Sequence, residues 1–385
     1  MTAPFAGAVG LNQKLLHRPG GRRQLETPAL LIDVDRLDRN IATLAARSRA
    51  RGLGLRPHAK SHKCARIAVR QIAAGANGVS CAKPGELLAL FAAGVGKLML
   101  SAPVASAAKI DALAGASAAG AELIVAVDRL PLLDAYAAAA TRHNTEIGVF
   151  VDLDIGLLRS GVATGAEAVA LARACAAAAN LRYLGVQAYE GRAQHIADFG
   201  QRRTSHAAST ARLRGILAAL ADAGLPAQNV SGGGTGSCRL DTDDQVFTEL
   251  QAGSYIFMDE AYLPIDIDGS GSPVFETALH VALTVIGHSS AGFAILDGGS
   301  KSLAVDGPPP RVYLDGRVVG RIEWCGDEYG RVLPASGCPV LPIGAVVECT
   351  VPHCDPTLNL HDVAHIVSGD RLIDFWPIDA RGRAD

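Results

Sequence analysis

Residues 56–63 of the chain read RPHAKSHK and place three lysine or arginine residues and two histidines in one short stretch. The stretch follows a short apolar segment, residues 53–55, and precedes an amphipathic run that starts near Cys64. This layout predicts a strand, a polar turn and a helix. A lysine close to other cations has a lowered pKa, and a neutral amine is a nucleophile that can bond covalently to a carbonyl. Lys60 is therefore a candidate catalytic lysine, although a solvated basic turn would contain the same residues.

A glycine-rich run, SGGGTGS at residues 231–237, follows another predicted strand. Glycines let backbone N–H groups approach an anion closely, and threonine and serine add hydroxyl donors. Because phosphate sites in α/β barrels commonly follow strands seven and eight, the run favours phosphate binding over an ordinary flexible turn. The residues predicted to bind phosphate are Gly233, Gly234, Thr235 and Gly236.

Two more loops carry side chains suited to chemistry. Arg159, in the segment DLDIGLLRSG, could hydrogen-bond a phenolate oxygen or a substrate carboxylate. An arginine in such a loop is, on its own, more typical of a solvated surface. His195 follows Tyr189 near the predicted end of a strand and could transfer a proton. A structural loop histidine is the alternative.

A candidate metal pair lies near the C-terminus, in the segment VPHCDPTLNLHD. Alternate side chains of an extended segment share a face, so we expect His353 and Asp355 to point the same way and Cys354 to point away. An imidazole plus a carboxylate suits a divalent cation such as Mn²⁺, Mg²⁺ or Zn²⁺. An ordinary hydrogen-bonded His–Asp pair would show the same two residues.

After an irregular N-terminal arm, residues 1–26, short apolar segments alternate with alanine-rich helical runs up to about residue 264. The expected strands are Ala29–Ile32, Leu53–Arg56, Gly78–Cys81, Lys97–Leu100, Glu122–Val127, Ile147–Val151, Tyr183–Gln187 and Asn229–Ser231. The expected helices include Leu37–Ala50, Ala65–Ala74, Gly85–Ala93, Ala105–Ala116, Ala166–Ala178 and Gln201–Ala223. This alternation predicts parallel βαβ units closed into a (β/α)₈ TIM barrel over residues 27–264. A doubly wound open sheet is the runner-up, and no G-x-G-x-x-G turn follows the first strand to support it.

The pattern changes after residue 264, where strand-like runs separated by Gly, Pro and Asp dominate. The expected strands are Leu279–Ile286, Phe293–Leu296, Arg311–Tyr313, Val346–Val351 and Leu372–Trp376. We therefore expect a second, mostly β domain over residues 265–385.

The composition argues against several classes of function. A net charge of -2 with scattered basic residues gives no support for a nucleic-acid or anionic-membrane partner. No apolar run approaches the ~18–20 residues of a membrane span. The start, MTAPFAGAVG, lacks the pattern of a secretory signal. The eight cysteines are widely spaced, without a C-x-x-C pair, which is typical of reduced thiols in a cytoplasmic protein.

The string RPHAKSHK follows TPALLIDVD by about twenty residues and resembles the pyridoxal-phosphate (PLP) enzymes of the D-threonine aldolase and D-serine dehydratase group. These enzymes are relatives of the alanine racemases. The resemblance runs from about Thr27 to Arg383, with its motifs in the family's order. It implies that Lys60 holds PLP covalently, that the N-terminal arm, residues 1–26, joins the β domain, and that the enzyme is a homodimer.

The resemblance also extends the site. The family shows a similar GGGTGS followed by ELQAGSY, here residues 249–255, which would complete the phosphate cradle. The residues that it adds to the cofactor site are Gly253, Ser254, Tyr255, Arg159 and Tyr189. It places His195 near the substrate hydroxyl. Two positions depart from the family pattern, Glu190 and Tyr329, where the family more often has histidine; a carboxylate at the first could change which substrate side chain is accepted.

The metal pair distinguishes branches of the family. The resembling aldolases have His-x-Asp at this point and the dehydratases have His-x-Cys, so His353 and Asp355 favour an aldolase. The activity implied is cleavage of a D-configured β-hydroxy amino acid to glycine and an aldehyde, with Mn²⁺ the favoured metal. The alternatives are a 3-hydroxyaspartate aldolase, a D-serine or D-threo-3-hydroxyaspartate dehydratase, and a non-catalytic PLP-binding barrel. The β domain counts against the last of these.

Overall fold

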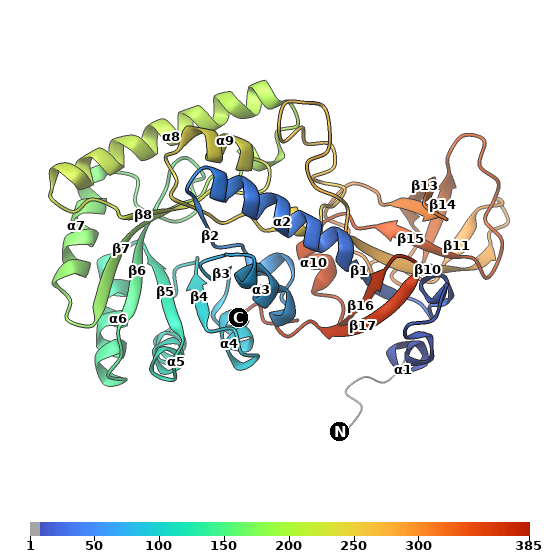
Figure 1. Cartoon of the computed structure of the whole chain (residues 1–385), viewed down its shortest axis with the longest axis horizontal. Coiled ribbons are helices and arrows are strands. Elements are labelled where there is room, and N and C mark those ends of the chain that lie inside the picture. The colour runs from blue at the N-terminus through green and yellow to red at the C-terminus, as the bar shows by residue number, and fades with distance from the viewer. Residues whose placement is uncertain (1–7) are drawn as a thin grey trace. The chain divides into compact units, whose positions relative to one another are not determined.

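The structure is a computed structural model that describes residues 8–385 and divides into two compact units (Figure 1). The unit that we call the barrel unit comprises residues 42–253, 265–274 and 383–385. The unit that we call the β unit comprises the chain up to Ile41, residues 254–264 and residues 275–382.

The barrel unit contains one eight-stranded parallel sheet with the strand order β2-β9-β8-β7-β6-β5-β4-β3. Its strands are β2 Gly54–Leu55, β3 Val79–Cys81, β4 Lys97–Leu100, β5 Glu122–Val127, β6 Ile147–Leu153, β7 Leu181–Ala188, β8 Asn229–Gly232 and β9 Glu249–Leu250. Backbone hydrogen bonds from Asn77 N to Leu55 O (2.7 Å) and from Ser80 N to Pro57 O (2.8 Å) join the two ends of this order. The sheet therefore closes on itself, and the predicted barrel is confirmed.

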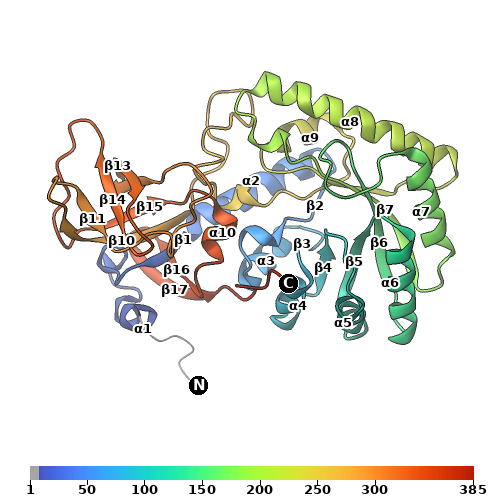
Figure 2. The ribbon, with the colours of Figure 1, turned by 180° about the vertical axis from the view of Figure 1, so that it is seen from behind.

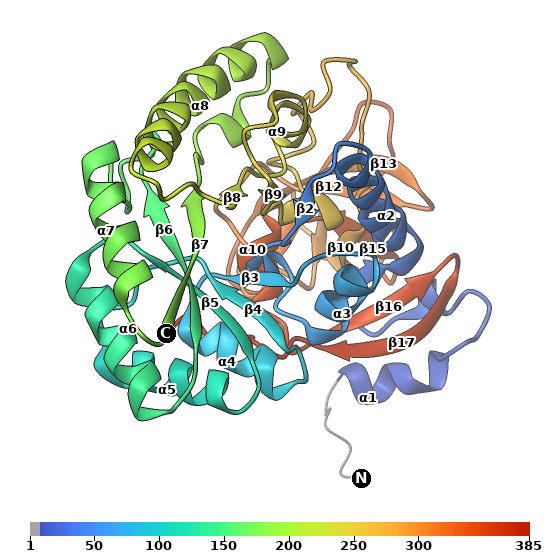
Figure 3. The same cartoon turned by 60° about the vertical axis from the view of Figure 1, so that its left-hand side comes forward.

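Helices surround the barrel strands (Figure 3). They are α3 Ala65–Ala73, α4 Pro84–Ala92, α5 Ala107–Ala118, α6 Leu130–Arg142, α7 Gly165–Ala177, α8 Phe199–Asp222 and the short α9 Cys238–Asp244, with the 3-10 turns η3 Ala59–Ser61 and η4 Ala193–His195. Local signals set several of their ends. Thr164 and Glu167 form a capping box at the start of α7, and the Asp198 side chain accepts from Gln201 N at the start of α8.

The structure corrects the first predicted barrel strand. The segment Ala29–Ile32 lies in β1, Ala29–Asp33, which pairs with strands of the β unit, and the eighth barrel strand is β9. All five β1 residues are buried, and a short, fully buried apolar strand has the same pattern in either sheet. The division into compact units differs from the predicted barrel bounds, residues 27–264, because residues up to Ile41 and residues 254–264 belong to the β unit.

The β unit contains a nine-stranded sheet with the order β11-β14-β13-β12-β15-β10-β1-β16-β17. Its strands are β1, β10 Leu279–His288, β11 Ala294–Leu296, β12 Arg311–Leu314, β13 Arg317–Trp324, β14 Gly330–Pro334, β15 Val346–Thr350, β16 Val363–Ser368 and β17 Arg371–Pro377. Figure 2 shows β16 and β17 beside β1. The sequence missed β13, β14 and β16. The other elements are α1 Ala8–Asn12, η1 Gln13–Leu15, η2 Gly21–Gln24, η5 Ser254–Ile256 and α10 Cys354–Leu358, and α2 Val34–Ala50 runs past the division at Ile41.

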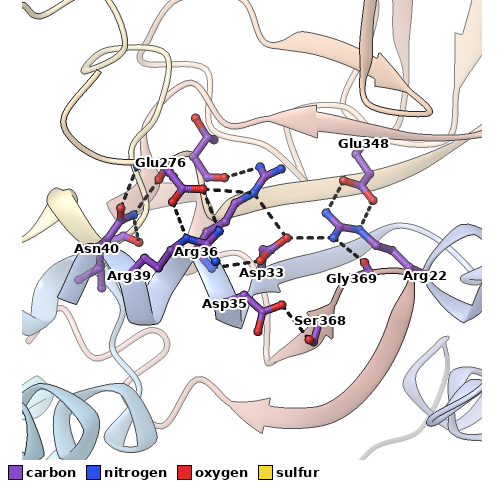
Figure 4. A network of polar contacts seen from close by, with 12 residues as sticks. Arg22, Asp33, Asp35, Arg36, Arg39, Asn40, Glu276, Glu348, Ser368 and Gly369 are labelled. Carbon is purple, nitrogen blue, oxygen red and sulfur yellow. Dashed lines mark hydrogen bonds and ion pairs between the residues drawn. The ribbon is translucent and has the colours of Figure 1, made fainter. Parts of the chain in front are cut away.

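The described part of the N-terminal arm packs on this sheet. Leu15 and Leu25 are buried in one apolar cluster with Leu31, Ala282 and Leu372. Arg22 fixes the arm electrostatically: its guanidinium forms two hydrogen bonds with Glu348 (2.6 and 2.8 Å) and one with Asp33 (3.0 Å), as Figure 4 shows. The arm is thus part of the β unit's core.

The structure tests two expectations from composition, the state of the cysteines and the presence of a membrane-spanning helix. All eight cysteines lie in the described part of the chain; none of them forms a disulfide there, and six of them are buried. Among residues 8–385, no helix combines the length and the apolar character that a membrane crossing requires.

Candidate functional site

The predicted cofactor residues of the barrel unit follow five strands that are consecutive neighbours in the sheet: β2, β9, β8, β7 and β6. Because every pairing among these strands is parallel, their carboxyl ends meet at one rim. We call the residues on this rim the rim arc; in order they are Lys60, Gly253, the 233–236 loop, Tyr189 and Arg159. Residues spread between positions 60 and 253 of the sequence therefore lie on one continuous part of the barrel mouth.

Lys60 sits in the 3-10 turn η3, directly after β2, and is exposed. Its backbone N–H donates to Nδ1 of His58 (3.4 Å), and the other ring nitrogen of His58 lies 3.1 Å from Ser101 Oγ. An Nδ1 that accepts places the ring proton on Nε2. The second lysine of the stretch differs: Lys63 is largely buried and donates to Glu86 (3.2 Å). Lys60 is thus the lysine of this stretch presented at the rim.

Arg159 belongs to a loop fixed by its own carboxylates. Its guanidinium carbon lies 5.6 Å from the ring centroid of Tyr189, within the range of a cation–π contact. The Asp154 side chain accepts the N–H groups of Gly156 (2.8 Å) and Leu158 (3.1 Å). These contacts bring the two predicted residues Arg159 and Tyr189 together.

Asp152, at the end of β6, is a buried carboxylate that the sequence did not single out. It accepts hydrogen bonds from Gln187 Nε2 (2.8 Å) and Ser160 Oγ (2.9 Å), and only 4% of its surface is exposed. Burial raises its pKa to about 6, and the charge of Asp128 acts in the same direction. A carboxyl that titrates near neutrality beside Arg159 is the kind of group that clusters at functional sites.

His195 ends the 3-10 turn η4, which is anchored on both sides. The Glu190 carboxylate accepts the N–H groups of Arg192 (2.9 Å) and Ala193 (2.7 Å). After the turn, buried Arg202 donates to the carbonyls of Ile196 and Ala197. The Glu190 carboxylate therefore caps the turn, and its influence on the accepted substrate side chain stays a prediction.

The glycine loop after β8 is buried from Ser231 to Cys238. Gly236 N and Ser237 N donate to Gln194 Oε1 (2.9 and 3.2 Å), and Gly234 N donates towards Ser237 Oγ (3.2 Å) and Asp241 (3.3 Å). These amides hold the loop itself, which differs from the expectation that they point at an anion.

Close contacts with Gln194 and one positive φ angle explain why this loop contains glycines. A Cβ on Gly234 would lie 2.4 Å from Gln194 Oε1, and one on Gly236 would lie 2.1 Å from the Gln194 carbonyl oxygen. Gly233 has a φ of 71°, in the left-handed region that favours glycine. Phosphate binding by Gly233, Gly234, Thr235 and Gly236 stays a prediction.

The other three residues predicted for the cradle are Gly253, Ser254 and Tyr255. Gly253 belongs to the barrel unit, where a Cβ would meet His58 O at 3.2 Å. Ser254 and Tyr255 belong to the β unit, both buried in η5. The Tyr255 ring contacts Phe275 edge to face, with centroids 5.6 Å apart. Their role towards a phosphate stays a prediction.

The structure brings the predicted metal pair together within the β unit. His353 Nε2 lies 3.9 Å from Asp355 Oδ1, and His353 Nδ1 lies 2.8 Å from Asp306 Oδ2. The expected extended segment is wrong beyond His353, because Asp355 lies in the first turn of α10. Buried Asp259 accepts from Cys354 N (2.8 Å) and so holds the start of this helix.

The donor set fits a divalent cation. A metal-binding histidine usually gives its second ring nitrogen to a carboxylate, which is the relation between His353 and Asp306. The 3.9 Å between His353 Nε2 and Asp355 Oδ1 is longer than a hydrogen bond, so these two atoms are not bonded to each other and both could serve as ligands. In the described part of the chain, no group of three His, Cys, Asp or Glu side chains forms a metal site, so water or substrate would fill the other positions.

PLP likewise fits the rim arc on the residues present. An exposed lysine, an arginine against a tyrosine ring and a glycine loop follow adjacent strands. Sequence reasoning missed the supporting residues Asp152, Asp241, Gln194 and Asp306. Gln194 stands beside His195, but nothing in the sequence marks its two-sided contacts; Asp306 comes from a loop far from His353.

The comparisons with known proteins decide the family. The sequence matches the family described as alanine racemase, N-terminal domain, over residues 32–261, and the putative serine dehydratase domain over residues 278–367. A 3-hydroxy-D-aspartate aldolase from Paracoccus denitrificans (strain Pd 1222) is 37% identical and covers 94% of this chain and 93% of its own length. The chain belongs to the D-threonine aldolase and D-serine dehydratase group of alanine racemase-like proteins.

Other members of this family agree in sequence and fold. A D-threonine aldolase from Arthrobacter sp. is 36% identical over 93% of both chains. The crystal structure of D-threonine aldolase from Filomicrobium marinum has a TM-score of 0.89 and 36% identity, covering 94% of this chain and 97% of its own. These relatives are named aldolases, which are lyases, and the family relation suggested by RPHAKSHK is confirmed.

Proposed function

We propose that the protein is a PLP- and divalent-metal-dependent aldolase that cleaves a D-configured β-hydroxy amino acid, such as D-threonine, into glycine and an aldehyde. The observation that carries the proposal is the rim arc, which assembles the five predicted cofactor positions on adjacent strands. The aldolase names of relatives at 36–37% identity support the same reaction.

Each residue of the arc has a proposed task. Lys60 holds the cofactor covalently, Arg159 and Tyr189 hold its ring, and the 233–236 loop with Gly253, Ser254 and Tyr255 holds its phosphate. When bound, PLP withdraws the electrons released at the substrate Cα. Tying the cofactor at three separate points fixes the reacting carbon, which is the protein's contribution to the chemistry.

His195 is the proposed base. It removes the proton of the substrate β-hydroxyl, so that the Cα–Cβ bond can break and the aldehyde can leave. His353 and Asp355 would hold the divalent ion, with Mn²⁺ favoured and Mg²⁺ or Zn²⁺ as alternatives, and Asp306 orients the histidine. Such an ion acts as a Lewis acid towards a hydroxyl oxygen.

Product analysis tests the proposal. Purified enzyme with PLP and Mn²⁺ is incubated with D-threonine, L-threonine, D-serine and 3-hydroxy-D-aspartate, with and without a chelator. We expect glycine and acetaldehyde from D-threonine, none from L-threonine, and loss of turnover on chelation. A keto acid and ammonia in place of glycine would instead establish the dehydratase, and full-rate cleavage by chelated enzyme would refute the metal's role.

The 3-hydroxyaspartate aldolase stays the second candidate, because a relative of that name is 37% identical over nearly the whole chain. Its products would be glycine and glyoxylate. The ratio of kcat/KM for 3-hydroxy-D-aspartate and D-threonine separates the two. We further propose a cytoplasmic homodimer, which sedimentation of the purified protein and cell fractionation would test.

A further inference from the structure

Gln194 is a buried side chain, 2% exposed, that contacts two segments of the predicted site at once. Its Oε1 accepts from Gly236 N (2.9 Å) and Ser237 N (3.2 Å) in the glycine loop. Its Nε2 donates to Glu190 O (3.2 Å), in the segment before η4, and to Ser237 Oγ (2.8 Å). The amide of Gln194 thus accepts two hydrogen bonds and donates two. Through them it joins the loop after β8 to the loop after β7.

The two joined segments have different proposed tasks. The η4 turn presents His195, and the Glu190 carboxylate fixes its start by accepting two N–H groups. The glycine loop has its own second support in Asp241, which accepts from Ser237 Oγ (2.6 Å) and lies 2.9 Å from His206 Nε2. Glu190 thus serves the turn alone, Asp241 serves the loop alone, and Gln194 serves both.

The close approach of Gln194 also requires glycine on the facing loop. Any Cβ at position 234 or 236 would come within about 2.4 Å of Gln194 atoms. The glycine run and Gln194 are therefore complementary parts of one contact. We infer that Gln194 is a positioning residue that couples the cofactor-phosphate loop to the turn carrying His195, an inference that rests on the proposed function for the roles of these two segments.

The test compares two segments in three variants. Gln194→Met keeps the length of the side chain and removes all its hydrogen bonds. In the cofactor-free protein, we expect faster hydrogen exchange in both residues 190–196 and residues 232–238. PLP binding should be at least about tenfold weaker. At saturating PLP, kcat should fall at least about tenfold, with KM within about threefold. Glu190→Gln should raise exchange in 190–196 only and lower kcat while PLP affinity stays unchanged.

The matched control is Gln201→Met, because Gln201 is exposed on α8 and its side chain supports neither segment. It should behave as wild type in every measurement. If Gln194→Met does not fold, Gln194→Glu keeps the acceptor for the loop amides but loses the donated bonds to Glu190 O and Ser237 Oγ. Exchange should then rise in both segments, and more in 190–196 than in 232–238.

Two results would overturn the inference. One is faster exchange in only one segment of Gln194→Met; the other is equal loss of PLP affinity in Glu190→Gln. Exchange and PLP affinity require no substrate, so they remain decisive if the wild-type protein cleaves no D-β-hydroxy amino acid. In that case the proposed function is wrong, and hydrogen exchange and PLP affinity still decide whether Gln194 couples the two segments.

Discussion

The barrel rim and the Arg22 cluster of the β unit both bury carboxylates, but they neutralise them in different ways. In the β unit, burial acts to raise the pKa of Glu348, and the hydrogen bonds and charge of Arg22 outweigh it, so this pKa is lowered. At the rim, Asp152 accepts hydrogen bonds from the neutral donors Gln187 and Ser160, and burial raises its pKa to about 6. The first arrangement holds a fixed negative charge, whereas the second gives a carboxyl that gains and loses its proton near pH 6.

The largest expected effect is on the stability of the β unit, when the cation of the Arg22–Glu348–Asp33 cluster is removed. Arg22→Met leaves Glu348 and Asp33 without their shared cation, and removing one partner of a mostly buried ion pair costs about 3–5 kcal/mol. We expect a lower free energy of unfolding in urea, with kcat of the folded enzyme little changed. Arg23→Met is the control, because Arg23 and its partner Asp315 are both exposed. Equal unfolding midpoints for the two variants would contradict a structural role for Arg22.

Lowering the pH should destabilise the β unit through protonation of His280. Burial lowers the pKa of His280 to about 4, well below the 6.5 of an unfolded chain. The unfolded state therefore binds the proton first, and stability present above pH 6.5 is lost as the pH falls towards 4, by up to about 3 kcal/mol. Hydrogen exchange of β10, corrected for intrinsic rates, should show this loss. A His280→Leu protein with the same loss would assign it to other groups.

Protonation of Asp152 should have the opposite effect on stability, which should rise as the pH falls. Its folded pKa of about 6 exceeds its unfolded value of 3.8, so the folded state binds the proton first. Ionised Asp152 therefore opposes folding above pH 6, and this cost is relieved as the pH falls from 6 to 4. In Asp152→Asn the relief should vanish, measured by exchange of β6. Identical pH dependence in wild type and variant would show that Asp152 ionises normally.

A smaller effect concerns the metal pair. Asp306→Asn should weaken binding of Mn²⁺ about 10–100-fold, because the carboxylate that orients His353 is lost while both proposed ligands remain. Calorimetric titration of Mn²⁺ into the metal-free protein measures this change. Asp327→Asn, on an exposed loop that contacts Ser300 and Lys301, is the matched control. Loss of affinity in the control alone would place the ion elsewhere.

The sequence predicted the residues that form the rim better than those that support it. Lys60 and the 231–237 run could be found because a strand, a turn and a helix have local signals. The contacts of Gln194 with Gly236 and of His353 with Asp306 join residues 42 and 47 positions apart, and no local pattern specifies them. The strand Ala29–Ile32 was misplaced because complete burial removes the alternation that distinguishes one sheet from another.

The central claim, that the rim arc holds PLP through Lys60, has a direct test in the two lysines of RPHAKSHK. The PLP-loaded enzyme is reduced with borohydride, digested and examined by mass spectrometry. We expect a stable pyridoxyl group on Lys60 and none on Lys63, which is paired with Glu86. Lys60→Ala should carry no covalent cofactor, whereas Lys63→Met should still be labelled at Lys60. Label on Lys63 or another lysine of the wild-type enzyme, or undiminished label in Lys60→Ala, would contradict the account.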